Sequence, residues 1–435
     1  MGGMPGHDHL PRQVDVPNVG AAAAPFFGPW VVRSAFVLAA FGWGVGFYGP
    51  AVFLHQVVER TGWSLALVSS AVTLHFLFGA ALVTQLPRLH RRYGVGPVAL
   101  VGSLVTTVGA LGWALASLPW MLFVAALASG SGWVTMGAAS INAAIAPWYI
   151  RTRPAALAKA YNGASIGGVV FSPLWVALIA QLGFAGAAAL IGALMVLIVA
   201  VLAHAVFSKT PQSLGQCADG DATGAPAVDI TSPDARALPG RLLWRDRRFR
   251  TLAAGMAVGL FAQIGLIAHL YSLLVLVVGA QTAGWAMGFA TLCAIGGRWW
   301  VVRMMPVGVD RRVLMAASYG IQLLGVTVLW LAGGKHTAFI VLGVTLFGAG
   351  IGNATSLPPL IAQVEFAPQD VVRVVATIIA FAQATYAFAP AAFGLVLATS
   401  SVQAPHIGRG AETFLLAVAL VQGLAIACFM AGRKA

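Results

Sequence analysis

The chain has 435 residues, of which 59% are hydrophobic and only 9% are charged. Soluble proteins carry roughly 25% charged residues, so the composition excludes a soluble enzyme, a disordered regulator and a disulfide scaffold. The 25 Lys and Arg residues against 12 Asp and Glu give a net charge of +13. Because these basic residues stand in short clusters between apolar blocks, they indicate membrane topology and not nucleic-acid binding.

Apolar blocks begin after a polar, Gly- and Pro-rich N-terminal tail, residues 1–29, which we expect to be disordered and cytoplasmic. A helix of about 20 apolar residues crosses the hydrocarbon core of a bilayer. The first half of the chain contains six such blocks, at 30–56, 64–86, 97–117, 119–146, 155–182 and 183–207. They predict a six-helix bundle over residues 30–207.

A hydrophilic segment, residues 208–248, separates these blocks from a second series. Six more blocks follow, at 249–278, 282–305, 311–333, 337–366, 370–399 and 409–432. They predict a C-terminal six-helix bundle over residues 249–432, joined to the first by a cytoplasmic loop. The expected fold is therefore an all-α polytopic membrane protein with twelve transmembrane helices.

The two halves share spaced landmarks. Gly132, within GSGWVTMGAAS, and Gly350, within GAGIGNATSLPP, stand 218 residues apart, and Pro173 and Pro390 stand 217 apart. A common offset indicates a duplicated six-helix unit, the arrangement of transporters whose substrate site lies between two halves near the membrane midplane. The glycine pairs 163/167 and 348/352 have the GxxxG spacing of close helix contacts.

Loop charges predict the orientation. The loops after the second, fourth, sixth, eighth and tenth blocks carry most of the Lys and Arg residues, as does the C-terminus. Positive loops face the cytoplasm, so both termini and the central loop are expected there, in a cytoplasmic or plasma membrane. A single twelve-helix unit suffices for transport, and we expect a monomer.

No catalytic motif occurs: the chain lacks HExxH, GxSxG and the phosphate-binding GxxxxGK[ST]. The three cysteines, Cys217, Cys293 and Cys428, are scattered without metal-ligand spacing. We therefore expect that the protein is not an enzyme and that it binds neither a cofactor nor a metal ion.

Arg298 is the main charge inside a predicted span, in ATLCAIGGRWWVVRMMP. A guanidinium inside a membrane is costly unless paired, and a carboxylate matches its two-pronged geometry. The spans offer no acid to pair with it, so a transported anion is one candidate partner. Alternatively, Arg298 reaches the headgroups beside the interfacial residues Trp299 and Trp300.

Other polar residues inside spans could line a substrate path or join helices. His269 and His75 could hold a proton near neutral pH. The remaining candidates for substrate binding are Tyr48, Tyr386, Gln383 and Asn353. Tyr48 and Tyr386 rank first among these, because they lie in the first and eleventh spans, which correspond in the two halves.

Segments 42–74 and 147–174 resemble the monocarboxylate and oxalate/formate antiporter branch of the major facilitator superfamily, as do the pairs His269-Leu270 and Gly297-Arg298. The resemblance implies alternating access and a small organic anion whose carboxylate is bound by Arg298. It also implies that Tyr48 and His269 line the cavity.

The chain departs from that branch at several positions. Ala294 stands where an acid is found one turn before the arginine, Ala51 replaces a first-span lysine, and Gln383 and Tyr386 occupy the span that carries a lysine in oxalate carriers. A single buried cation favours a monocarboxylate. The prediction is a secondary transporter of a monocarboxylate, with possible proton coupling. The alternatives are efflux of amphipathic drugs and a non-transporting membrane sensor.

Overall fold

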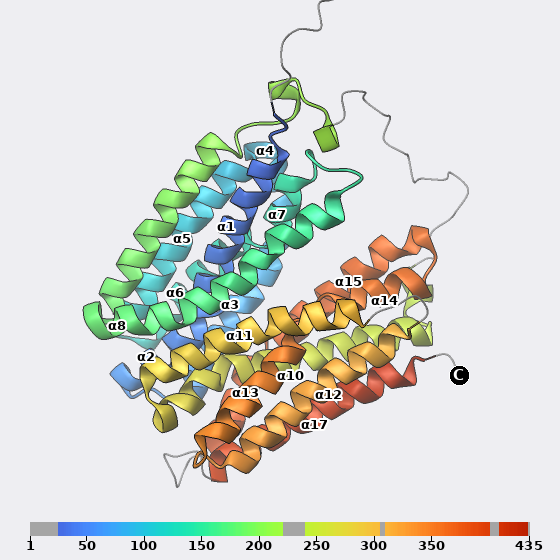
Figure 1. Ribbon diagram of the computed structural model, residues 1–435. Helices are drawn as coiled ribbons and strands as arrows, with labels where there is room; N and C mark the ends of the chain where they lie inside the picture. The colour runs from blue at the N-terminus through green and yellow to red at the C-terminus, as the bar shows by residue number, and fades with distance from the viewer. Residues whose placement is uncertain (1–24, 221–239, 305–308, 401–408, 434–435) are drawn as a thin grey trace, which may run out of the picture.

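The structure, a computed structural model, describes residues 25–220, 240–304, 309–400 and 409–433, and every element in these ranges is helical (Figure 1). The N-terminal half contains α1 (Gly28–Gly46), α2 (Gly49–Thr61), α3 (Leu65–Val83), α4 (Leu86–Tyr93), α5 (Val95–Leu115), α6 (Pro119–Trp133), η1 (Val134–Met136), α7 (Ala138–Ile145) and α8 (Arg153–Ala205). The short helices η2 (Gln212–Leu214), η3 (Ala218–Gly220) and α9 (Gly240–Leu243) belong to the linking segment. The C-terminal half contains α10 (Arg247–Val278), α11 (Ala280–Arg303), α12 (Arg311–Ala332), α13 (Thr337–Ile351), α14 (Leu357–Glu365), α15 (Pro368–Tyr386), α16 (Ala389–Ser400) and α17 (Arg409–Ala431).

The all-helical membrane fold is confirmed. Within the described ranges, nine helical segments are long and apolar enough to cross a membrane. One of them, α8, has 53 residues and reverses direction at Gly183, whose φ of 71° and ψ of 169° are non-helical. Glycine adopts this conformation without a Cβ penalty. The sequence also divides the chain at Gly183, into its fifth and sixth spans; the count of twelve spans stays a prediction.

Two predicted spans are interrupted at matching positions of the halves. The fourth block forms α6, η1 and α7, with Gly137 extended between η1 and α7. The tenth forms α13 and α14, which are separated by residues 352–356. These breaks begin at Val134 and Gly352, which are 218 residues apart. They follow the small-residue landmarks that the sequence predicted to be repeated, because glycine-rich segments hold a helix weakly.

The paired glycines lie at close helix contacts, as their spacing predicts. A Cβ on Gly167 of α8 would overlap the Ala40 backbone of α1, and one on Gly352 would overlap the Ala294 backbone of α11. Helices associate in lipid by such close packing, since no hydrophobic effect drives them together there.

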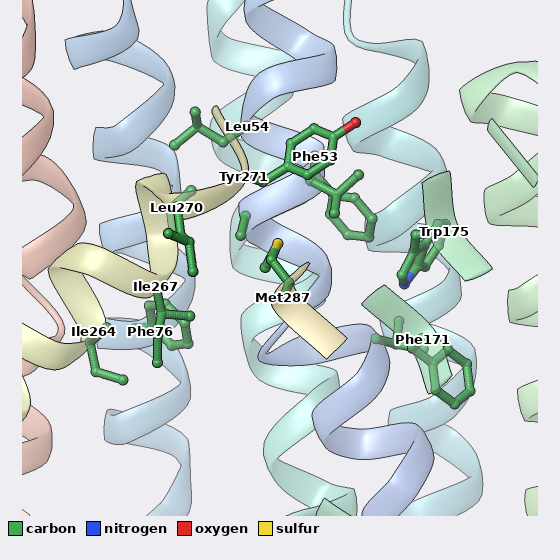
Figure 2. Packing of buried hydrophobic residues seen from close by; sticks show 14 of the residues in the cluster. Phe53, Leu54, Phe76, Phe171, Trp175, Ile264, Ile267, Leu270, Tyr271 and Met287 are labelled. Atoms are coloured by element: carbon green, nitrogen blue, oxygen red, sulfur yellow. The ribbon is translucent and has the colours of Figure 1, made fainter. Parts of the chain in front are cut away.

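The halves meet at one end and diverge at the other. Figure 1 shows the helices α1–α8 and α10–α17 as two groups that spread apart toward the end with α4, α7 and the C-terminus. Contacts between the groups join α2 to α10, α3 to α16 and α8 to α11. In Figure 2, Phe53 and Trp175 from the N-terminal half lie beside Tyr271 and Met287 from the C-terminal half. One apolar cluster therefore spans both halves where they meet.

Most of the tail that is predicted to be disordered, residues 1–24, and the middle of the predicted central loop, residues 221–239, lie outside the described residues. The described parts next to them are ordered against the N-terminal half. Phe27 packs its ring on Trp148 at a centroid distance of 5.5 Å, and its backbone N–H donates to Gln216 Oε1 at 2.9 Å. The Asp219 side chain accepts hydrogen bonds from the backbone N–H groups of residues 150–152.

Candidate functional site

Arg298 lies on α11 where this helix crosses α8 of the other half. Its Nη2 donates a hydrogen bond to Ser165 Oγ on α8. The next two side chains, Trp299 and Trp300, are 62% and 58% exposed and point away from the bundle. The helix therefore separates the charge from the aromatic pair: Arg298 faces the interface between the halves, and the tryptophans face outward.

Tyr48 lies next to this arginine. It occupies the break between α1 and α2, and its hydroxyl lies near Thr291 and in the field of the Arg298 guanidinium. Gly168 of α8 makes room for the pair, because a Cβ there would lie 2.6 Å from Tyr48 Cε2 and 2.7 Å from Thr291 Cγ2. We call Ser165, Gly168, Tyr48, Thr291 and Arg298 the Arg298 cluster.

The Arg298 cluster is electrostatically incomplete. Among the residues that the structure describes, Arg298 forms no ion pair. The described carboxylates stand in loops or near helix ends: Glu59, Asp219, Asp246, Asp310, Glu365, Asp370 and Glu412. A partly buried guanidinium whose described hydrogen bond goes to a neutral hydroxyl retains the capacity to bind an anion.

Aromatic rings connect Tyr48 to Tyr386 of the other half. The Tyr386 ring lies 6.2 Å from Phe76, which lies 5.9 Å from Phe47, and Phe47 lies 5.0 Å from Tyr48. Gln383 stands one turn before Tyr386 on α15 and is half-buried. Tyr48 and Tyr386, which the sequence predicts to occupy corresponding spans, are thus joined by a continuous row of aromatic rings across the interface.

His269 occupies a different place, among α10, α16 and α17. Its Nε2 bonds the Pro390 carbonyl oxygen at 3.0 Å, and its ring lies 5.8 Å from Phe414. The buried Nδ1 has no hydrogen-bond partner in the described structure, and neither has the nearby Ser69 Oγ. None of the described contacts joins His269 to the Arg298 cluster.

His75 is fully engaged by the protein. Its Nδ1 and Nε2 lie 2.8 Å from Ser129 Oγ and from the Gly46 carbonyl oxygen, and its ring stacks on Trp133. Asn353 is buried in the break between α13 and α14. These contacts connect helices, and the predicted roles of His75 and Asn353 in substrate binding stay predictions.

Sequence reasoning missed Ser165, Gly168 and Thr291. Thr291 precedes Arg298 by seven residues, which places both on one face of α11. Ser165 and Gly168 lie in the GASIGG run, whose glycines the sequence analysis assigned to helix packing. The seven-residue spacing from Arg298 could have identified Thr291. The partner of Arg298 on α8 could not be identified in this way, because it depends on how the two halves pack. The described residues contain no group of three or more His, Cys, Asp or Glu side chains placed to hold a metal ion.

Helices long enough to span a membrane, arranged in two halves with polar groups at their interface, define a multi-pass membrane protein. The chain belongs to the Major Facilitator Superfamily, whose family model matches residues 34–395. It is similar to Monocarboxylate transporter 13 of Bos taurus, at 29% identity over 220 residues that make up 48% of either chain. The chain thus matches about half the length of that relative.

Solved structures share the fold at low sequence identity. A bacterial homolog of the human lysosomal transporter Spinster, in an inward-facing and occupied conformation, superposes with a TM-score of 0.68 at 13% identity, over 94% of this chain and 97% of that one. A mutant of the nucleoside transporter NupG superposes with a TM-score of 0.71 at 12% identity, over 93% and 100%. These structures show the shared fold, and the family match indicates a transporter and not an enzyme.

Proposed function

We propose that this transporter carries a small monocarboxylate and that Arg298 binds the carboxylate. The observation that supports this most directly is an arginine at the interface of the halves that contacts Ser165, lies near enough to Tyr48 to influence its hydroxyl electrostatically, and has no described acidic partner. A carboxylate can accept two parallel hydrogen bonds from a guanidinium. The distant relationship to a monocarboxylate transporter supports the same class of substrate.

A single carboxylate fits this site better than two. One guanidinium neutralises one negative charge, and the other polar groups in the cluster are the hydroxyls of Ser165, Tyr48 and Thr291. A second carboxylate would lose water without gaining a cation, which costs several kcal/mol. Lactate-like and pyruvate-like anions, with one carboxylate and one neutral polar group, match this set of groups.

Transport would proceed by alternating access. The apolar cluster around Phe53, Tyr271 and Met287 closes one end, while the halves diverge at the end with the C-terminus (Figures 1 and 2). Arg298 contacts α8 of the opposite half, so a substrate that replaces Ser165 as its partner would change an interaction between the halves. The diverging end would face the cytoplasmic side of the cell membrane, because most of the Lys and Arg residues in loops lie at that end.

Proton coupling is the second part of the proposal. His269 is buried, its Nδ1 has no partner in the described structure, and α16 and α17 pack around it. A proton on Nδ1 would balance part of the charge of a carried anion. Uptake driven by an inward proton gradient in the wild type, and lost in His269→Ala, is the expected result. Uptake that ignores the gradient in both proteins would contradict the coupling and leave the substrate assignment standing.

The substrate assignment is tested in proteoliposomes with labelled lactate, pyruvate, formate, acetate and oxalate. Truncating one partner of a buried charge pair costs about 2–5 kcal/mol, so Arg298→Gln is expected to lower uptake by about 30-fold or more. The matched control is Arg303→Gln, because Arg303 lies five residues further along α11, with its guanidinium 5.7 Å from the Trp299 ring. The control is expected to retain uptake within about twofold, the size of an exposed-charge effect.

Three outcomes are informative. Saturable uptake of one monocarboxylate that needs Arg298 but not Arg303 supports the proposal. Equal losses in both variants would mean that the arginines act as membrane anchors. Transport of amphipathic cations, with every acid excluded, would instead make the protein an efflux carrier of the same superfamily.

A further inference from the structure

A groove on the outer surface of the C-terminal half lies between the first turns of α10 and the last turns of α17. It has a volume of about 400 Å³. The lining residues are Arg247, Arg250, Thr251 and Ala254 from α10, and Ala427, Cys428 and Ala431 from α17. Figure 1 shows α17 along the outer edge of the C-terminal group, at the end where the chain terminates. The groove is thus separate from the Arg298 cluster.

The polar end of the groove carries two cations. Arg247 and Arg250 are exposed and form no ion pair within the described ranges. The carboxylate nearest in sequence, Asp246, accepts the Arg248 backbone N–H at 2.7 Å as the helix cap. The Thr251 hydroxyl, one turn above Arg247, donates to the Arg247 carbonyl oxygen at 2.8 Å.

The other end of the groove is apolar. Ala254 and Ala427 have small side chains that leave the space open. Beyond them, the exposed residues Leu416, Leu420 and Leu424 continue along α17 at a spacing of four, which places them on one face of the helix. Their exposed fractions are 55%, 67% and 55%, so this face meets lipid chains once the helix lies in a bilayer.

We propose that this groove binds an anionic phospholipid, with the phosphate at Arg247 and Arg250 and an acyl chain along α17. Paired guanidinium groups match phosphate oxygens, and basic pockets between transmembrane helices accommodate anionic headgroups. The phosphate would also lie at the positive end of the α10 dipole, which begins at Arg247. A zwitterionic lipid offers the same chains but adds a cation that the two arginines repel.

The position of the groove gives the lipid a structural effect. Thr251 accepts a hydrogen bond from Arg312 Nη1 at 3.1 Å, and Arg312 is paired with Glu365 of α14. A headgroup at Thr251 would therefore join α10 and α17 beside the ion pair that connects α12 to α14. The bound lipid is expected to stabilise the C-terminal half.

The test is native mass spectrometry of the full chain in detergent, titrated with phosphatidylglycerol and with phosphatidylcholine of identical chains. Each arginine near a lipid surface contributes about 1 kcal/mol, so the double variant Arg247→Gln, Arg250→Gln is expected to weaken phosphatidylglycerol binding about 30-fold. Binding of phosphatidylcholine is expected to change less than twofold, because the attraction of its phosphate by the arginines is offset by the repulsion of its choline cation. The matched control is Arg91→Gln, Arg92→Gln, which removes two exposed arginines from the N-terminal half.

A second variant separates the groove from general surface charge. Ala427→Phe fills the apolar end without altering any charge, and it is expected to weaken binding of both lipids. Equal affinity for the two lipids in the wild type would overturn the proposal, as would equal losses in the double variant and its control. Binding of glycerol phosphate as tight as that of phosphatidylglycerol would also overturn it, because the acyl chain would then contribute nothing.

Discussion

Replacing Glu365 by alanine is expected to destabilise the C-terminal half more than any other removal of a described carboxylate. Glu365 Oε1 and Oε2 accept hydrogen bonds from Arg312 Nε and Nη2 at 2.6 and 2.7 Å. The Arg312 side chain is 1% exposed and the Glu365 side chain 16%. The substitution would leave a buried guanidinium with neutral partners only, Thr251 Oγ1 and two backbone carbonyl oxygens.

The magnitude follows from burial. Breaking a buried ion pair on one side costs about 3–5 kcal/mol, a change of roughly 150- to 4,000-fold in the ratio of folded to unfolded protein. Glu59→Ala is the matched control, because Glu59 is 67% exposed and lies 3.6 Å from His55. An exposed pair of this kind contributes about 0–1 kcal/mol, and less when salt screens it.

The assay is equilibrium unfolding in mixed detergent and SDS micelles, followed by tryptophan fluorescence. A second comparison isolates the cause. Glu365→Leu combined with Arg312→Met removes both charges, and apolar replacements of a buried pair are often neutral. The reasoning is refuted if Glu365→Ala costs no more than Glu59→Ala, or if the double variant is as unstable as Glu365→Ala alone.

Three further predictions concern the cluster, the packing and the linking segment. Gly168→Val pushes against Tyr48 and Thr291, so initial uptake is expected to fall at least about 10-fold while the amount of folded protein is unchanged. His75→Ala removes a hydrogen bond from the Gly46 carbonyl oxygen and one from Ser129 Oγ, which keeps Trp113 and Ala126 as partners, and it is expected to cost about 1–3 kcal/mol of unfolding free energy with KM unchanged. The pKa of Asp219 is lowered to about 2, since hydrogen bonds from the Thr152 side chain and three backbone N–H groups outweigh the partial desolvation that raises it. Its docking contribution is therefore complete above the unfolded pKa of about 3.9 and is lost as pH falls toward 2, which a fluorine NMR label on Cys217 can follow.

Controls distinguish these predictions from general damage. Gly296→Val adds the same side chain to α11 where a Cβ would meet no atom within 4 Å, and it should leave uptake intact. A raised KM with unchanged stability in His75→Ala would contradict a packing role and restore the predicted substrate role of this histidine. For Asp219, a fluorine signal that moves well above pH 4, or moves identically in Asp219→Asn, would contradict the assignment.

Composition and hydropathy alone predicted the class of protein. The apolar blocks coincide with the described helices to within a few residues, because the hydrocarbon core requires every backbone group to bond within its own helix. Glycine spacing also predicted the contacts at Gly167 and Gly352, since only residues without a Cβ allow two backbones to approach that closely. The breaks inside the first, fourth, tenth and eleventh blocks were not predicted, because hydropathy reports burial in lipid and not helix continuity.

The candidate site was predicted in part. The sequence identified Arg298 as the unusual charge and Tyr48 as a residue that could line a substrate path, and it left open whether the arginine faces the cavity or the headgroups. Only tertiary packing places Arg298 against Ser165, which is 133 residues away, while Trp299 and Trp300 take the outer side. From α11 alone, Arg298 could face either the other half or the lipid headgroups. The packing of α8 against α11 decides between these two orientations.

Glu365 and the two histidines show the same division. Nothing in the sequence connects Glu365 with Arg312, which is 53 residues away, because a carboxylate next to a loop is usually solvated. His75 and His269 are alike as isolated residues in apolar spans, yet the fold engages both nitrogens of the first and leaves Nδ1 of the second without a described partner. Periodicity determines which residues lie within the membrane; which groups they meet there depends on helices far apart in the chain, and so the tertiary structure decides it.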